Sequence, residues 1–299
     1  GRLDEAAWSA AEAAGGFTES YPRPGAPARS PTEARVLYDD AALYVAVRMY
    51  DHPDSVAAPL ARRDASGIHS DWLHLMVDSY HDRRTAFRFS VNPRGVQKDV
   101  FHSDDDEEDT GWDAVWTVAT WIDSLGWTAE YRIPFSQLRF GPEGGERVWG
   151  LGIQRDVARR DERTSWSPWT REDAGFVSRF GDLRGLVGVG APGRLEVQPY
   201  SLARVTRAPG DRADPFHAPT DASASLGADV RYGLPSGLTL TAAVNPDFGQ
   251  VEVDPAVVNL SAYETFFEER RPLFVEGSDI FRFRHPTASY NNNRHTPPF

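Results

Sequence analysis

The 299-residue chain contains no cysteine. This absence excludes disulfide bonds, cysteine-ligated zinc, iron–sulfur clusters and a catalytic thiol, and it leaves the cellular compartment open. The chain also lacks an apolar run of the roughly 18 residues that indicate a membrane-spanning helix, so no transmembrane segment is predicted. With 40 % apolar and 25 % charged residues, the composition is that of a folded globular protein.

Lysine is nearly absent. The 32 basic residues are Lys98 and 31 arginines, which are spread along the chain without a dense basic patch. The formal net charge is -12, and residues 99–113 hold eight acidic side chains and no Lys or Arg. Nucleic acid is therefore not an expected partner.

Tryptophan is missing from the last 130 residues, whereas all nine tryptophans lie between Trp8 and Trp169. A stretch rich in glycine and proline at 186–194 separates the two parts, and such a stretch forms no regular element. The sequence therefore predicts two regions, residues 1–190 and residues 191–299.

Apolar residues alternate with other residues in the first region, which is typical of β-strands. The segments with this pattern are 43–50, 72–78, 87–91, 127–133 and 149–153. Turn residues recur between them and only residues 4–14 suggest a helix, so an all-β antiparallel β-sandwich is predicted. The second region alternates at 195–199, 226–232 and 238–244, which predicts a small β-rich extension. Its small residues and threonines fit either the lumen side of an outer-membrane barrel or an edge sheet of a soluble domain.

Particular strings carry a family resemblance. LDEAAW, TEARVLYDDAALYVAVRMYD, GWTAEYRIPFSQLRF and SRFGDLRGL resemble the carbohydrate-binding family 9-like β-sandwich, in the version found at the N-terminus of bacterial proteins of the DUF5916 family. Residues 244–281, from VNPDFGQVEV to FVEGSDIF, resemble that family's signature. The resemblance implies a sandwich over residues 1–190 with carbohydrate as its ligand. It also implies that residues 191–299 are a truncated lead-in to a membrane-type barrel, ending in a polar tail.

Sugar-binding sandwiches stack exposed indole rings on the C–H faces of pyranoses. The candidate rings lie beside an acidic turn or in the loop-like string TSWSPWT, and they are Trp112, Trp116, Trp166 and Trp169. Packing in the core or at a protein interface is the alternative, since tryptophan usually fills cores.

The acidic run offers a second candidate site. Calcium prefers six to eight oxygen ligands, and the carboxylates that we consider for it are Asp104, Asp106, Asp109 and Asp113. The alternative is a solvated, self-repelling loop or a docking site for a basic partner. No cofactor other than calcium is indicated. The histidines show no metal-binding spacing, and His74 and Met76 are too close on one strand to be opposite axial ligands of a haem.

The signature region contains apolar residues that must pack on the sandwich or on a partner, and these docking residues are Tyr263, Phe266, Phe267, Leu273 and Phe274. Two functions remain open. The first is a non-catalytic, carbohydrate-binding module of the periplasm or outer-membrane periphery. The second is an accessory or scaffold subunit that docks on the periplasmic face of a membrane protein complex, respiratory or photosynthetic. A glycoside-active enzyme is a distant third, because no pair among the 44 acidic residues is distinguished by its spacing.

Overall fold

The computed structural model describes residues 1–141, 145–168, 173–190, 194–207, 220–233 and 239–245. The chain divides into two compact units, residues 1–192 and residues 193–299. Strands dominate the described residues of both units, which confirms the predicted all-β class.

The first unit contains twelve strands in its described residues: β1 (Thr18–Tyr21), β2 (Thr32–Tyr38), β3 (Ala42–Tyr50), β4 (Trp72–Asp78), β5 (Ala86–Val91), β6 (Gln97–Ser103), β7 (Glu107–Asp109), β8 (Thr117–Asp123), β9 (Gly126–Pro134), β10 (Glu146–Val157), β11 (Glu162–Ser165) and β12 (Gly181–Val187). One short helix, α1 (Ala6–Ala10), and four single turns complete it: η1 (Pro53–Ser55), η2 (Phe135–Gln137), η3 (Ala158–Arg160) and η4 (Val177–Arg179). The helix is shorter than the predicted 4–14. No described helix approaches the roughly 20 residues needed to cross a membrane.

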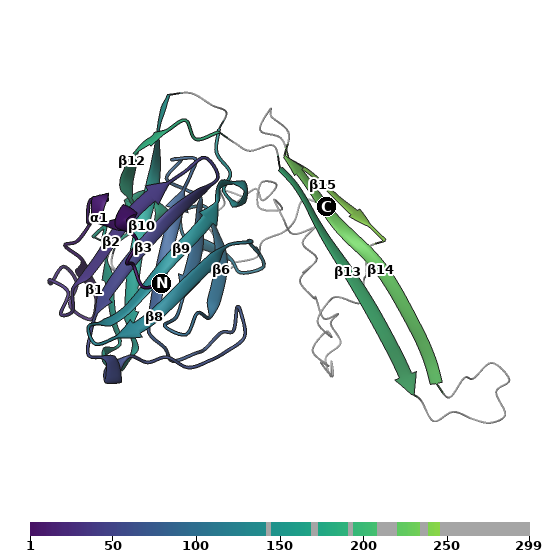
Figure 1. Ribbon diagram of the computed structural model, residues 1–299, viewed down its shortest axis with the longest axis horizontal. Helices are drawn as coiled ribbons and strands as arrows, with labels where there is room; N and C mark the ends of the chain where they lie inside the picture. The colour runs from purple at the N-terminus through teal and green to yellow at the C-terminus, as the bar shows by residue number, and fades with distance from the viewer. Residues whose placement is uncertain (142–144, 169–172, 191–193, 208–219, 234–238, 246–299) are drawn as a thin grey trace, which may run out of the picture. The chain divides into compact units, whose positions relative to one another are not determined.

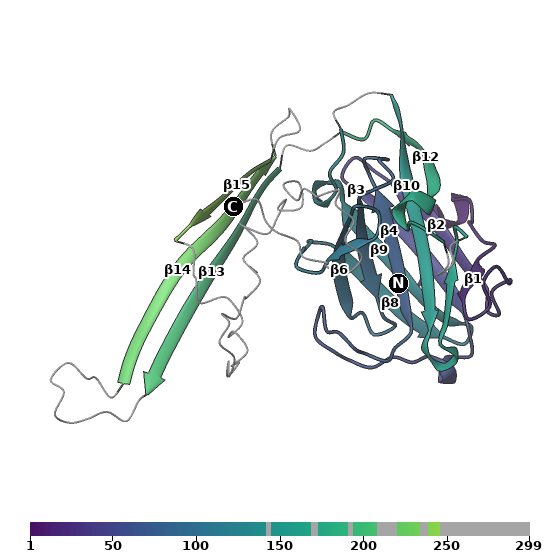
Figure 2. The same ribbon diagram turned by 180° about the vertical axis from the view of Figure 1, so that it is seen from behind.

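These strands form two antiparallel sheets. The four-stranded sheet has the order β2-β3-β9-β8, and the eight-stranded sheet has the order β1-β11-β10-β4-β5-β6-β7 with β12 beside β10. The two layers pack face to face; the smaller sheet faces the viewer in Figure 1 and the larger one in Figure 2. The predicted antiparallel β-sandwich is thus confirmed.

Strand alternation explains how the core forms. Leu73, Leu75 and Val77 of β4 point into the sandwich, where they join buried residues such as Trp127 and Trp149. The other β4 residues, Trp72, His74, Met76 and Asp78, point to the outer face of the larger sheet. The candidate site described below lies on this face.

Part of that outer face is covered by the segment 173–180, which includes η4. Val177 and Phe180 pack on Met76 and Ala86 as a second, smaller apolar cluster. This cover explains why β4 is buried on both faces although it belongs to an antiparallel sheet. It also creates the walls of the pocket considered below.

The second unit contains a three-stranded antiparallel sheet in its described residues. The strands are β13 (Arg194–Arg207), β14 (Thr220–Gly233) and β15 (Thr239–Val244), and their order is β13-β14-β15. The register of the three strands places their exposed apolar side chains on the same face of the sheet. These side chains are Leu195, Val197, Val205, Leu226, Tyr232, Leu240 and Val244. The other face carries polar residues such as Gln198, Ser223 and Thr241.

Candidate functional site: the outer face of the larger sheet

A row of polar side chains crosses five neighbouring strands on the outer face of the larger sheet. Register places them side by side on β11, β10, β4, β5 and β6, and we call Ser165, Gln154, His74, Ser90 and Lys98 the polar row. His74 Nδ1 lies 2.8 Å from Ser90 Oγ, and its Nε2 lies 3.2 Å from Asp156 Oδ2. At the end of the row, the Lys98 ammonium lies 5.8 Å from the centre of the Trp72 ring.

One carboxylate organises the charges beside the row. Arg163 donates two hydrogen bonds to Asp156, from Nε at 2.6 Å and from Nη2 at 2.7 Å. Burial raises the pKa of Asp156, but the bonds from Arg163 and the nearby His74 outweigh burial and hold that pKa well below its usual range. Burial dominates at His74, whose pKa is lowered in spite of Asp156. The imidazole is therefore a neutral hydrogen-bonding group at pH 7.

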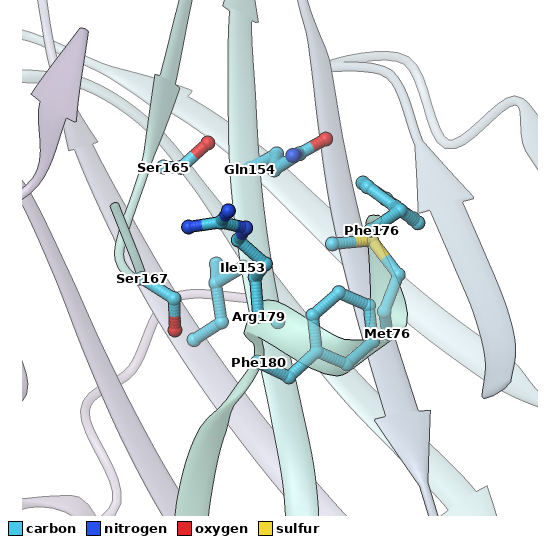
Figure 3. A pocket seen from close by; sticks show the side chains of 9 residues that line it. Met76, Ile153, Gln154, Ser165, Ser167, Phe176, Arg179 and Phe180 are labelled. Atoms are coloured by element: carbon cyan, nitrogen blue, oxygen red, sulfur yellow. The ribbon is translucent and has the colours of Figure 1, made fainter. Parts of the chain in front are cut away.

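A small pocket opens next to the row (Figure 3). Its walls combine apolar and polar groups, and its lining comprises Met76, Gly152, Ile153, Gln154, Ser165, Ser167, Phe176, Arg179 and Phe180. Gly152 permits this arrangement, because a Cβ atom there would lie only 2.8 Å from both Met76 Cε and the Phe180 ring. The recess has room for about one water molecule, so a larger ligand could only lie across its mouth on the face of the sheet.

Gln154 is the central polar group, since it belongs to both the row and the pocket. The residue is only 5 % exposed, and within the described part of the chain its side-chain amide makes no hydrogen bond. Ser165, by contrast, shares a hydrogen bond of 2.7 Å with Ser20. The amide atoms of Gln154 are not among the fully buried side-chain atoms that lack a partner, so they reach the surface of the pocket and offer one donor and one acceptor group there.

Of the four predicted platform rings, the structure buries Trp116 and leaves Trp112 and Trp166 partly exposed, so the tryptophan platform stays a prediction. Trp116 is 4 % exposed, stacks on Tyr131 and donates from Nε1 to Asp99 Oδ1 at 2.5 Å. Trp112 is half-buried, with its ring centre 5.1 Å from that of Phe87. Trp166 packs on the core and crowds the backbone of Gly181, while Trp169 lies outside the described residues.

The carboxylates of the acidic run do not converge as the predicted calcium site, and the run combines exposed carboxylates with ion pairs to arginine. Asp104 pairs with Arg84 and Glu108 with Arg88, while Asp109 accepts the N–H of Gly111. Asp106 and Asp113 are exposed. Nowhere in the described ranges do three or more His, Asp or Glu side chains converge as metal ligands. Alternation along β6 and β7 separates the carboxylates, and arginines neutralise several of them.

Sequence reasoning missed most of the pocket. The alternation at 149–153 continues to Gln154 and could have placed it on the outer face, but FVSRF at 176–180 has no periodicity that places Phe176, Arg179 or Phe180 there. The five docking residues at 263–274 lie outside the described residues, so their packing stays a prediction.

The two packed antiparallel sheets define the first unit as a β-sandwich domain with a small, largely apolar pocket on its outer face. The family model described as carbohydrate family 9 binding domain-like matches residues 1–184, and the chain belongs to that family. The model of a domain of unknown function, DUF5916, matches residues 191–285. Both matches confirm the predicted resemblance. A search of curated proteins found no match.

Solved structures of related domains are similar only at low identity. A carbohydrate-binding module of family 9 from Caldicellulosiruptor kristjanssonii, in complex with cellotriose, is 18 % identical with a TM-score of 0.44 over 60 % of this chain and 85 % of that one. The glucose complex gives 20 % and 0.44 over 63 % and 92 %. A putative carbohydrate-binding protein from Bacteroides uniformis gives 15 % and 0.48 over 59 % and 87 %.

Proposed function

We propose that the first unit is a non-catalytic module that binds carbohydrate on the outer face of the larger sheet, along the polar row and across the mouth of the small pocket beside it. The observation that carries this proposal is the Gln154 amide, which lines the pocket and makes no hydrogen bond within the described chain. Membership of a carbohydrate-binding-like family supports the same ligand class. Sugar hydroxyls would form hydrogen bonds with the Gln154 amide, the Ser165 hydroxyl and the Arg179 guanidinium. The C–H face of the sugar ring would contact Phe176 and Phe180.

The pocket chemistry supports binding without catalysis. Glycoside hydrolysis ordinarily needs two carboxyl groups on either side of the bond, and the described lining contains no Asp or Glu. Asp156, the carboxylate nearest the row, is held by Arg163 and His74. A glycosidase role is therefore not part of the proposal.

Isothermal titration calorimetry with glucose and cellotriose tests the proposal. Gln154→Leu should weaken binding about tenfold, since it removes a group that can donate and accept hydrogen bonds to the ligand. The matched control is Gln198→Leu, because Gln198 is exposed on β13 in the second unit. Wild-type protein that binds neither sugar, or a Gln154→Leu variant with unchanged affinity, would contradict the proposed site.

The second unit favours a further role, docking on a membrane protein complex. Its three-stranded sheet exposes a continuous apolar face, on which Leu226 is 74 % and Leu195 67 % exposed. Exposed apolar patches of this kind are typical of interaction surfaces. We place the protein in the periplasm or at the outer-membrane periphery, where such a complex presents its periplasmic side.

Cell fractionation tests the docking role and the location together. The protein should sediment with membranes and migrate with a membrane complex on native gels. Val197→Asp with Leu226→Asp, on the apolar face, should release it, whereas Gln198→Asp with Ser223→Asp, on the polar face, should not. Release by neither pair, or recovery of wild-type protein in the cytoplasm, would count against this role.

A further inference from the structure

Lys98 is the one cation of the polar row and its surroundings whose charge is unbalanced. Three arginines on this face each have a carboxylate: Arg163 pairs with Asp156, Arg88 with Glu108 and Arg179 with Asp173. Within the described ranges, no carboxylate lies at ion-pair distance from the Lys98 ammonium. The arrangement therefore leaves one positive charge for a ligand.

The surroundings of Lys98 hold its ammonium on the sheet face. Lys98 is half-buried on β6 opposite Ser90, and its ammonium lies over the Trp72 ring. The Trp72 ring in turn stacks on His74, with 6.3 Å between ring centres. A cation–π contact favours the charge there, but it cannot neutralise it. An anionic group of a ligand would supply both the counter-charge and a charge-assisted hydrogen bond.

Lys98 and the pocket lie on one line across the sheet. Gln154 on β10 and Lys98 on β6 are separated by three strand spacings, which amounts to about 14 Å. This span exceeds a single sugar ring, and hydroxyl and imidazole groups of Ser90 and His74 fill the interval. The line suits a short chain of sugars.

We propose that the polar row binds an acidic oligosaccharide, with one sugar at Gln154 and the carboxylate of a uronic acid unit at Lys98. The inference rests on the proposed carbohydrate-binding function and names its substrate class. Binding at Lys98 adds affinity for the acid beyond that for the neutral sugar.

Calorimetry with a matched pair of ligands tests this inference. Cellotriose is compared with the same trisaccharide oxidised at C6 to its uronic acids. The acidic ligand should bind about tenfold tighter, and this gain should shrink as salt is raised. Lys98→Gln and Lys98→Met should each remove the gain of the acidic ligand over cellotriose. Arg62→Gln, at an exposed position on the loop before β4, is the control.

The outcomes separate the two proposals. Equal affinity for both ligands, or a gain that survives in a folded Lys98 variant, overturns the inference and leaves the carbohydrate-binding function in place. Binding of neither ligand by wild-type protein overturns the proposed function and the inference with it. Two Lys98 variants are used so that a folding defect in one, detected by near-ultraviolet circular dichroism, does not decide the result.

Discussion

Asp105 Oδ1 accepts the backbone N–H of Phe176 at 2.9 Å, so a carboxylate of the acidic run holds one wall of the pocket. It also accepts the N–H of Ser178 at 2.8 Å, and Oδ2 accepts the Ser178 hydroxyl at 2.9 Å. Burial raises the pKa of Asp105, but the N–H groups of Ser178 and Phe176 outweigh it, and the pKa is lowered. The position of the segment 173–180 thus depends on Asp105, which does not line the pocket itself.

Replacement of Asp105 by Ala should therefore loosen this wall. We expect the free energy of unfolding to fall by about 1–2 kcal/mol, because the N–H groups of Phe176 and Ser178 lose hydrogen bonds to a charged acceptor, and sugar affinity to fall with it. Urea unfolding and calorimetry measure the two effects. Asp106→Ala is the control, since Asp106 is exposed and makes no contact in the described chain. Equal behaviour of the two variants would show that Asp105 does not position the wall.

The contribution of Asp105 should also depend on pH in a defined direction. Because its pKa is lower in the folded than in the unfolded chain, its stabilisation is complete above the unfolded value and is lost as pH falls through the folded value. The difference in stability between wild type and Asp105→Ala should therefore shrink on acidification. A difference that grows toward low pH would contradict this assignment.

Trp116 should contribute to stability and not to sugar binding. Trp116→Phe removes the indole N–H that reaches Asp99 and leaves that buried acceptor one donor short. The expected loss is about 1–3 kcal/mol in the free energy of unfolding. Cellotriose affinity, measured on the folded variant, should stay at the wild-type value. A selective loss of sugar binding would place Trp116 in the tryptophan platform that the sequence predicts.

His102 should make the protein sensitive to acid. The residue is 1 % exposed and neither ring nitrogen has a hydrogen-bond partner in the described structure. Burial first, and then the charge of Arg88, lowers the pKa of His102 to about 3, against the opposing effect of Glu108. The unfolded chain therefore binds a proton here at a higher pH than the folded chain, and stability falls as pH drops below the unfolded value.

His102→Leu tests this effect. Relative to wild type, the variant should gain about 2 kcal/mol in the free energy of unfolding between pH 8 and pH 5. The comparison uses the change with pH, so a constant packing cost of the leucine cancels. Parallel stability curves for the two proteins would show that His102 does not titrate in this way.

Residues 1–190 should fold without the rest of the chain. Their core unites both sheets around buried side chains such as Trp127, Trp149 and Phe89, and a domain of this size buries enough apolar surface for independent stability. The isolated piece should show near-ultraviolet circular dichroism and a cooperative thermal transition. A product with secondary structure but no near-ultraviolet signal would place the domain boundary elsewhere.

The sequence predicted the sandwich because alternation is a local property. Leu73, Leu75 and Val77 face one way in any strand that contains them, and the structure places them in the core. The partners of the acidic run were not predictable in this way. Arg84 and Arg88 meet Asp104 and Glu108 only because β5 pairs with β6 and β6 with β7.

The pocket also depends on contacts between segments that are distant in the sequence, which a local pattern cannot predict. Gln154 reaches the outer face by simple alternation, but Phe176 and Phe180 reach it through η4 and the tie to Asp105, which lies 71 residues earlier than Phe176. No periodicity encodes such a contact. The burial of Trp116 was not predictable for a related reason, since the residues around a ring do not reveal which neighbouring strands will cover it.

Arg155 joins the two sheets, and its removal should be the most destabilising change considered. The side chain is fully buried and donates to the carbonyl oxygens of Pro31 and Tyr50 at 3.1 and 3.0 Å. It also donates to Asp51 Oδ2 at 3.2 Å. Burial lowers the pKa of Arg155 to about 10, so the guanidinium is charged at neutral pH.

Arg155→Met fills a similar volume but leaves these buried acceptors and the Asp51 carboxylate without their shared donor. The expected loss is about 3–5 kcal/mol in the free energy of unfolding, typical of a broken buried ion pair. Arg159 pairs with the same carboxylate from a partly exposed position, so Arg159→Met should cost only about 1 kcal/mol. Urea unfolding at pH 7 compares them, and similar losses for both variants would show that burial does not set the cost.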